Sequence, residues 1–257
     1  MKSKKIAEKL WKADREKQTL PRFSKSGGFS LDTAYEIQRH LLSLHQKSGA
    51  KVVGRKMGMT SVAKMQQMKI DAPIHGFLTD AMEVNDGGKL SLSKRIQAKV
   101  EPEIAFLVGK DLSGNPSISQ CLDSVKWVMG ALEIIDSRFE NYDFQLPDVV
   151  ADNCSSAGFV LGKQKVRPGD LRGLENLGIV LELNGKPVQF GSSSAILGHP
   201  ARSLADLVAL LHREGEILPA GSIVLAGGAT AAVSLSAGDW VRARFDQLGE
   251  VEFWVTD

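Results

Sequence analysis

Three glutamates stand in parts of the sequence that are otherwise apolar. Glu101 and Glu103 fall in the run VEPEIAF, and Glu133 falls in ALEIIDSRFENYDF. An ionised carboxylate with such neighbours loses much of its hydration energy unless a cation or a hydrogen-bond donor replaces the water. We therefore expect a positive charge beside these carboxylates.

A divalent metal ion would meet this requirement. Side chains alternate along a strand, so Glu101 and Glu103 would project to the same side, with their Cα atoms roughly 6.6 Å apart. Oxygen ligands favour a hard cation, and the nearby sequence offers no Cys or His at zinc-ligand spacing. Mg²⁺ or Mn²⁺ is therefore expected, and zinc is disfavoured.

The alternative is that the E-x-E run lies on a solvated edge strand. Pro102 would suit an edge because proline cannot donate a hydrogen bond to a central ladder. Glu133 argues against this alternative, since the surrounding WVMGALEIID is too apolar for a simple surface strand.

Cations are available in the same conspicuous segments. Lys56 lies in VVGRKMGMTS, Arg138 lies in IIDSRFEN, and Lys99 stands just before the E-x-E run. Each could instead be an ion-pair partner at the surface. For Lys56 we favour burial, because apolar residues flank it on both sides.

Two further segments combine small polar residues with glycine. ADNCSSAGFVLG places Asp152, Asn153, Ser155 and Ser156 ahead of a glycine, and the run from Gly227 to Thr230 follows the strand-like SIVLA. Such residues suit a loop that approaches a ligand closely, or they form a structural turn. Composition alone leaves both interpretations open.

Composition excludes several classes of protein. The 257 residues include 32 basic and 30 acidic side chains with 6% aromatic residues, which argues against nucleic-acid binding. The charged N-terminus lacks the apolar core of a signal peptide, and no run is long enough to span a bilayer, so a cytoplasmic protein is expected. Cys121 and Cys154 are interpreted as reduced, packed thiols.

Common catalytic fingerprints are absent. The sequence contains no G-x-S-x-G nucleophile elbow, no P-loop and no dinucleotide-binding glycine motif. Serine hydrolase, NTPase and Rossmann interpretations are therefore removed. Metal-assisted chemistry on a small anion remains.

The elements that would position these residues can be predicted from periodicity. Helices are expected near the N-terminus, on a stripe of Ile6, Leu10 and Trp11, and over 31–46, where Ser30 and Thr33 supply capping oxygens. A further helix is expected in SLADLVALLHREGE, ending at Gly215.

From residue 51 onwards, short apolar runs separated by turns predict strands, and Asn184-Gly185 predicts a tight hairpin. The expected architecture is α+β, with a mixed, strongly bent β-sheet core. A division into a helical lead-in, 1–75, and a catalytic β-rich part, 76–257, is expected, with one continuous domain as the alternative.

Taken together, several motifs resemble the hydratase and decarboxylase branch of the fumarylacetoacetate hydrolase superfamily. They cover roughly residues 30 to 255 in this order: KMGMTSVAKMQQM, PIHGFL, VEPEIAF, ALEIIDSRFENYDF, VVADNCSSAGFVLG, SSAILGHPARSL and AGSIVLAGGATAA. The resemblance implies the bent sheet core of that superfamily's C-terminal domain. It also implies Mg²⁺ or Mn²⁺ held by Glu101, Glu103 and Glu133.

Within this branch, KMGMTS, AKMQQM and PIHGFL look most like members that decarboxylate 2-oxo-3-hexenedioate (4-oxalocrotonate) to 2-hydroxypenta-2,4-dienoate in the meta-cleavage catabolism of catechols. Hydration of 2-hydroxypenta-2,4-dienoate is the alternative. The resemblance also implies self-association and a complex with the hydratase of the same pathway. A non-catalytic partner subunit is the remaining possibility, against which the intact set of glutamates argues.

The resemblance implies roles for the remaining candidate residues. Lys56, Asp152 and Ser156 would be catalytic, and a 2-oxo dicarboxylate substrate would contact a second group of residues: Met57, Ser61, Arg138, Gly228 and Thr230. His75 stands where an aromatic residue is common in the branch. No His–Glu dyad of the hydrolase branch is recognisable in the sequence, which weakens a C–C hydrolase interpretation.

Overall fold

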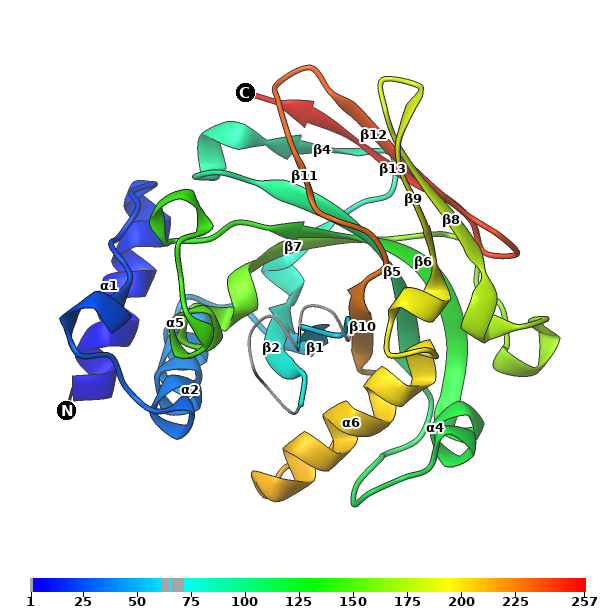
Figure 1. Cartoon of the computed structure of the whole chain (residues 1–257), viewed down its shortest axis with the longest axis horizontal. Helices are drawn as coiled ribbons and strands as arrows, with labels where there is room; N and C mark the ends of the chain where they lie inside the picture. Colours follow the sequence, from blue (N-terminus) through cyan, green and yellow to red (C-terminus); the bar gives the residue numbers. More distant parts are fainter. Residues whose placement is uncertain (1, 62–64, 66–71) are drawn as a thin grey trace.

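Two β-sheets and a set of helices make up the structure, a computed structural model that describes residues 2–61, 65 and 72–257. The larger sheet has the strand order β2-β1-β10-β5-β6-β7-β3, with β11 added beside β5. Its strands are β1 (Val52–Gly58), β2 (Ile74–Thr79), β3 (Glu83–Val84), β5 (Lys99–Val108), β6 (Val125–Ile135), β7 (Ser156–Leu161), β10 (Ile223–Gly228) and β11 (Val233–Ser234). The sheet is mixed and curves strongly across the molecule (Figure 1), as the sequence predicted.

The smaller sheet has the order β4-β13-β12-β8-β9. Its strands are β4 (Gly88–Ser91), β8 (Gly178–Leu183), β9 (Lys186–Ser192), β12 (Trp240–Phe245) and β13 (Gly249–Thr256). The predicted hairpin is confirmed between β8 and β9, because Asn184 and Gly185 adopt φ angles of 53° and 75°. Positive φ at both positions matches the right-handed twist of the two strands.

The predicted N-terminal helices are present as α1 (Lys2–Glu16) and α2 (Leu31–Lys47). The buried stripe of α1 consists of Ser3, Ala7, Leu10 and Ala13, whereas Ile6 and Trp11 are only partly buried. The Ser30 hydroxyl accepts a hydrogen bond from the Thr33 N–H at 3.2 Å, which caps α2 as predicted.

Three more α-helices are described, together with several short 3-10 helices: α4 (Ile118–Ser124), α5 (Leu146–Ala151) and α6 (Pro200–Arg213). Helix α6 begins three residues before the predicted segment, because Pro200 fits the first helical turn and the His199 Nδ1 accepts the Ala201 N–H at 3.0 Å. The helix is followed, as predicted, by Gly215 at a φ of 77°.

The larger sheet separates two hydrophobic cores. One core joins α6 and the smaller sheet to side chains such as Met57, Ile104 and Phe106. The other joins α1, α2 and α5 to side chains such as Ala105 and Leu225. Because neighbouring residues of a strand face opposite ways, the face of β5 that carries Ala105 also carries Glu101 and Glu103. The carboxylates therefore lie on the sheet face that packs against the N-terminal helices.

Strand β5 is interior rather than at an edge, since β10 and β6 pair with it on its two sides. Pro102 is accommodated because its main chain faces the interval between the end of β10 and the start of β11, where Ala229 N–H donates to the Pro102 carbonyl at 3.0 Å. The edge-strand alternative for Glu101 and Glu103 is therefore rejected.

The division expected at residue 75 falls inside β2, and β1 pairs in parallel with β10 in the same sheet. One continuous domain agrees with this pairing, whereas the division itself stays a prediction. Most of the AKMQQM segment lies outside the described residues.

Candidate metal centre

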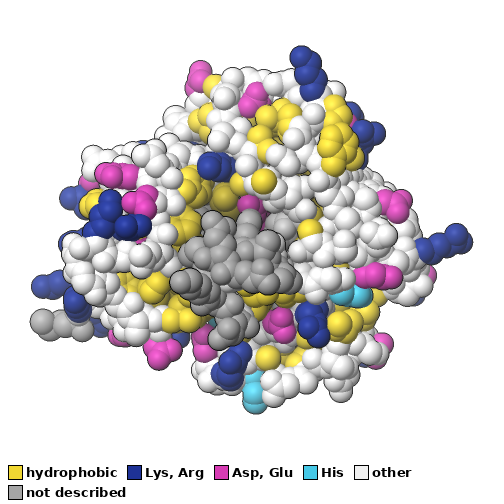
Figure 2. Space-filling model, in the orientation of Figure 1, with side chains coloured by type: hydrophobic (Ala, Val, Ile, Leu, Met, Phe, Trp, Pro, Cys, Tyr) yellow, Lys and Arg dark blue, Asp and Glu magenta, His cyan; other side chains and the backbone are white. Residues whose placement is uncertain are grey.

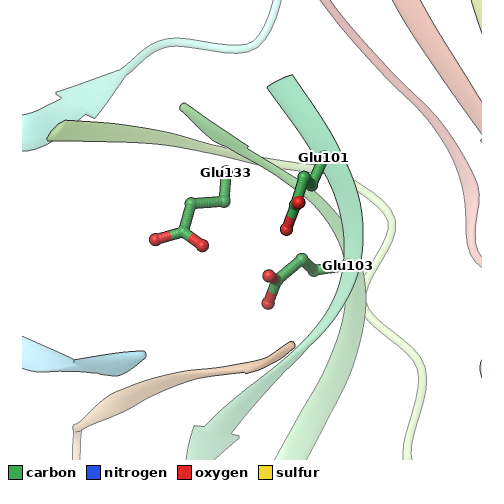
Figure 3. A group of neighbouring side chains, drawn as sticks. All are labelled: Glu101, Glu103 and Glu133. Carbon is green, nitrogen blue, oxygen red and sulfur yellow. The ribbon is translucent and has the colours of Figure 1, made fainter. Parts of the chain in front are cut away.

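Glu101, Glu103 and Glu133 converge on one point (Figure 3). Glu101 and Glu103 extend from the same face of β5, and the register of the antiparallel pair places Glu133 of β6 directly opposite Glu101. One carboxylate oxygen from each lies within 4.8 Å of the others, and all three side chains are buried. The predicted convergence of the carboxylates is confirmed.

The described residues do not satisfy Glu103 fully, and burial disfavours the ionised forms of both Glu103 and Glu133. The Glu103 Oε2 accepts the Gly227 N–H at 2.7 Å, but its Oε1 has no hydrogen-bond partner among the described residues. Burial, and then the nearby Glu133 carboxylate, raise the pKa of Glu103 well above its ordinary value. Burial also raises the pKa of Glu133, against the opposing charge of Lys56.

Such a set of ligands fits a hard divalent cation. Carboxylate oxygens on two adjacent strands can share one ion, and an ion would replace the hydration that burial removes. The unsatisfied Glu103 oxygen is the observation in this structure that favours this interpretation.

Lys56 is the cation closest to the cluster in the described structure. Its side chain extends from β1 and is 5% exposed, and its Nζ lies 3.0 Å from the Glu133 Oε2. The same Nζ donates a hydrogen bond to the Cys154 carbonyl at 3.2 Å. Burial alone would lower the pKa of Lys56, but the Glu133 carboxylate and its neighbours raise it, so the ammonium stays charged. The predicted burial of Lys56 is confirmed.

A cavity of about 260 Å³ opens beside Lys56 and Glu101. Part of its wall is polar, with Thr60, Ser61 and Ser155, and another part is apolar and aromatic. Figure 2, in the orientation of Figure 1, shows hydrophobic side chains in several patches on this side of the molecule, with many of the Lys and Arg side chains along its outline. The apolar and aromatic lining residues are Met59, Ile74, Ile135, Tyr142, Phe144 and Val149.

Glycines keep the carboxylates accessible to this cavity. A Cβ at Gly228 would lie 2.4 Å from the Glu101 Oε2, so any side chain there would displace the carboxylate. A Cβ at Gly227, whose φ is 114°, would lie 2.0 Å from the Thr60 hydroxyl. The glycine pair therefore serves a close approach between β10 and the site.

Only some of the residues predicted to contact the substrate line this cavity. Gly228 and Ser61 line the cavity, whereas Thr230 is not among its described lining residues and donates its hydroxyl to the Ala231 carbonyl. Met57 also borders the cavity, but strand alternation directs its side chain to the face opposite Lys56, into the core shared with α6. Its contribution to the cavity is therefore expected from its main chain.

The structure does not bring Arg138 and Asp152 into this cavity. Both side chains are buried and form a salt bridge with each other, and the Arg138 Nη2 also donates to the Asp152 carbonyl at 2.6 Å. Burial raises the pKa of Asp152 to about 6, with Arg138 opposing the shift. Arg138 borders a second cavity, of about 150 Å³, between the N-terminal helices and the sheet.

Ser156 occupies an intermediate position. It borders the second cavity, and its hydroxyl has no hydrogen-bond partner among the described residues, although it acts with the charge of Lys56 against the burial that raises the pKa of Glu133. The preceding Asn153 has a structural role, since its side chain accepts the Phe77 N–H at 2.8 Å and donates to the Phe77 carbonyl at 3.0 Å. It thereby pairs with β2 as a neighbouring strand would.

A His–Glu pair that the sequence did not reveal joins His75 to Glu214, with 3.2 Å between the His75 Nε2 and the Glu214 Oε1. The ring of His75 stacks on Tyr35. His75 pairs with Met57 across β1 and β2, so its side chain lies on the sheet face opposite Lys56. The pair is therefore not a dyad of the carboxylate cavity.

Several residues that line the cavity were not predicted from the sequence as site residues. Ile135, Tyr142 and Phe144 all lie within the Glu133 motif ALEIIDSRFENYDF, which was the available signal, but strand periodicity does not extend into the loop that carries the two aromatic residues. Ser155 and Cys154 lie in the ADNCSSAG motif, in which Ser156 and Asp152 were preferred. The loop conformation, rather than residue type, decides which of them faces the cavity.

Comparison with known proteins gives a family for the chain. Residues 51–256 match the family described as fumarylacetoacetate (FAA) hydrolase C-terminal. A 4-oxalocrotonate decarboxylase of a Pseudomonas species is 43% identical over 256 residues, covering 100% of this chain and 99% of that protein. A 2-hydroxyhexa-2,4-dienoate hydratase of Comamonas testosteroni is 37% identical over 248 residues, covering 95% and 92% of the two chains.

A solved structure is also similar. It is 4-oxalocrotonate decarboxylase from Pseudomonas putida G7 complexed with magnesium and adipate, with a TM-score of 0.95 and 36% identity. The similarity covers 99% of this chain and 97% of that one. The described helices all lack the length or the apolar character needed to cross a lipid bilayer.

Proposed function

The chain belongs to the fumarylacetoacetate hydrolase superfamily, and we propose that it is a metal-dependent decarboxylase, a carbon–carbon lyase that converts 2-oxo-3-hexenedioate (4-oxalocrotonate) to 2-hydroxypenta-2,4-dienoate in catechol meta-cleavage. The observation that carries this proposal is the buried convergence of Glu101, Glu103 and Glu133 beside Lys56. The full-length similarity to decarboxylases at 43% identity supports the choice of reaction.

Mg²⁺, or Mn²⁺ in its place, would be held by Glu101, Glu103 and Glu133. When bound, such an ion supplies a Lewis acid that draws electron density from the 2-oxo group of the substrate. The three carboxylates thereby fix which end of the substrate, the 2-oxo acid end, lies deepest in the cavity.

The reaction requires one proton. Breaking the C5–C6 bond releases the distal carboxylate as CO₂ and leaves an electron pair that moves along the conjugated chain to the 2-oxygen, where one proton is taken up. Lys56 is the proposed donor of this proton, because its ammonium lies 3.0 Å from Glu133 and therefore beside the carboxylate cluster. Its charge also offsets part of the negative charge that a dianionic substrate adds.

The apolar part of the cavity suits the other end of the substrate. Ile135, Phe144 and Val149 offer no hydrogen bonds from their side chains, so they exclude water from the region into which CO₂ leaves. The distal carboxylate of the substrate loses hydration energy in this apolar region, whereas neutral CO₂ has little hydration energy to lose. The region therefore favours cleavage of the C5–C6 bond. Asp152 is paired with Arg138 outside the cavity, and Ser156 lies near Glu133. Neither residue is therefore assigned a direct contact with the substrate.

Hydration of 2-hydroxypenta-2,4-dienoate is the second candidate, which the similarity to a dienoate hydratase favours. One assay separates the two reactions: the protein is incubated with Mg²⁺ and each acid, while CO₂ release and dienol absorbance are followed. Release of CO₂ supports the decarboxylase, and loss of absorbance without CO₂ supports the hydratase. Absence of both would reject both reactions and leave a non-catalytic partner subunit.

Self-association, a complex with the hydratase of the same pathway and a cytoplasmic location belong to the same proposal. Pathway enzymes that pass a reactive dienol from one to the next gain from such a complex. Size-exclusion chromatography with and without the hydratase would test both kinds of association.

A further inference from the structure

A three-residue turn beside the cavity has a costly backbone conformation. Asn153, Cys154 and Ser155 have φ angles of 50°, 52° and 59°, so three consecutive residues other than glycine are left-handed. Each such residue costs conformational energy, and strain of this kind persists only where the surroundings impose it.

The surroundings hold this turn at several points. The Asn153 side chain is paired with the main chain of Phe77, and the Cys154 carbonyl accepts a hydrogen bond from the Lys56 Nζ. The Ser155 N–H donates to the Asp152 carbonyl at 2.9 Å, and its carbonyl accepts the Asp136 N–H at 2.8 Å. The turn is therefore fixed directly beside Lys56.

The turn places the Ser155 hydroxyl in the lining of the carboxylate cavity. Ser155 lines the carboxylate cavity and is 3% exposed, yet its Oγ has no hydrogen-bond partner among the described residues. The neighbouring Ser156 hydroxyl also has no hydrogen-bond partner among the described residues, but Ser156 borders the second cavity, so only Ser155 brings such a hydroxyl to the carboxylate cavity. A buried hydroxyl without a partner is destabilising, because it has lost water and gained nothing in return.

We propose that the Ser155 hydroxyl is a substrate-binding group, which donates a hydrogen bond to an oxygen of the 2-oxo acid beside Lys56. This inference rests on the proposed function, because the 2-oxo acid is the ligand which that function brings into the cavity. The unpartnered hydroxyl, its place in the cavity lining and the contact of its turn with Lys56 all agree with this role. The left-handed turn is then the device that directs Ser155, rather than Ser156, at the substrate.

The test compares Ser155→Ala with Ser193→Ala. Ser193 is a matched control, because it is equally buried but its hydroxyl is satisfied: it donates to the Leu174 carbonyl at 2.7 Å and accepts the Leu177 N–H at 2.8 Å. The Mg²⁺-saturated full-length proteins are compared by Tm, by kcat/KM for CO₂ release and by affinity for 2-oxoadipate, a diacid without the conjugated double bond.

We expect Ser155→Ala to keep or raise the Tm, to lower kcat/KM at least 10-fold and to weaken 2-oxoadipate binding. Ser193→Ala should lower the Tm and leave the kcat/KM of the folded protein unchanged. The inference is overturned if Ser155→Ala binds 2-oxoadipate and turns over substrate as the wild type does, or if its losses follow a lowered Tm as in the control.

The binding arm keeps this inference separate from the proposed reaction. If the wild-type protein releases no CO₂ but binds 2-oxoadipate, the decarboxylase proposal fails, and the affinity of Ser155→Ala still decides the role of Ser155. If the wild-type protein does not bind 2-oxoadipate either, the inference about Ser155 fails with it.

Discussion

Two regions of the molecule bury glutamate and treat its charge in opposite ways. On the smaller sheet, Glu182 is 4% exposed and both of its oxygens are paired with arginine: Arg242 Nη2 lies 2.7 Å from Oε2, and Arg244 Nη2 lies 2.7 Å from Oε1. The two arginines, themselves 26% and 53% exposed, cover the carboxylate near the surface of the protein. Although burial acts to raise it, the hydrogen bond and charge of Arg242, with the charge of Arg244, lower the pKa of Glu182.

On the larger sheet the balance is reversed. Glu133 is paired with the buried Lys56, one Glu103 oxygen has no partner among the described residues, and burial raises the pKa of both Glu103 and Glu133. Burial of an acidic side chain is therefore not what marks a functional site. The mark is a buried carboxylate oxygen, here of Glu103, that has no partner among the described residues and that a bound cation would satisfy.

Removing the lysine should have the largest effect. Lys56→Ala is expected to lower kcat by about 10² to 10⁴, the range for a group that transfers a proton in the reaction. The matched change, Arg242→Ala, removes a cation beside Glu182 and should leave kcat unchanged. Steady-state CO₂ release measures both, with circular dichroism to verify folding. Near-native turnover of Lys56→Ala would remove this residue from the mechanism.

Neutralising a glutamate should change the affinity for Mg²⁺ on the larger sheet but not on the smaller sheet. Glu103→Gln keeps the acceptor for the Gly227 N–H but loses a charged ligand, so Mg²⁺ affinity should fall by more than about 10-fold, the lower limit for losing a group that merely supports a ligand. Glu182→Gln should leave it unchanged. Isothermal titration with Mg²⁺ measures both affinities. Equal affinities for wild type and Glu103→Gln would reject the ligand assignment.

The same two substitutions should have opposite effects on the free energy of unfolding. Glu182→Gln removes a charge that two arginines compensate, and we expect it to lower the free energy of unfolding by about 1 kcal/mol, a modest figure because both arginines are partly exposed. Glu103→Gln should stabilise the metal-free protein, because it removes a repelled carboxylate. Urea unfolding in EDTA measures both changes. A loss of stability in metal-free Glu103→Gln would contradict the comparison.

The smallest effect concerns pH. The folded-state pKa values of Glu103 and Glu133 are raised, so the folded protein binds more protons than the unfolded chain above the ordinary value of 4.5, and metal-free stability should fall as pH rises through that window. The pKa of Glu182 is lowered, so its contribution is present above 4.5 and is lost as pH falls below it. Unfolding curves from pH 4 to 8 in EDTA test both slopes, and saturating Mg²⁺ should abolish the first.

Local pattern predicted the parts of the fold and site that depend on neighbours in sequence. Alternation in β5 placed Glu101 and Glu103 on one face, and the Asn184-Gly185 turn fixed the β8–β9 hairpin. Helices α1, α2 and α6 followed from their apolar periodicity, whereas the short helices α4 and α5 were not predicted. In each case the residues that decide the structure lie within a few positions of one another.

The remaining features of the site depend on where individual side chains point, which the periodicity of the sequence does not determine. Sequence gave no means of knowing that Arg138 and Asp152 pair with each other instead of facing the cavity, because both charges suited either place. Residue alternation also breaks down in the left-handed turn before β7, so it did not identify Ser155 as the cavity residue. His75 and Glu214 are far apart in the chain, and only the packed structure brings them together.

The pairing of β1 with β10 has a consequence for the order of folding. The strands that carry the glutamates are antiparallel neighbours with a short connection, whereas β1, which carries Lys56, pairs in parallel with a strand near the far end of the chain. Closing the longer loop costs more entropy and is expected to be slower. During synthesis the β5–β6 pair therefore emerges and brings its carboxylates together before β10, the parallel partner of the strand that carries Lys56, has been made.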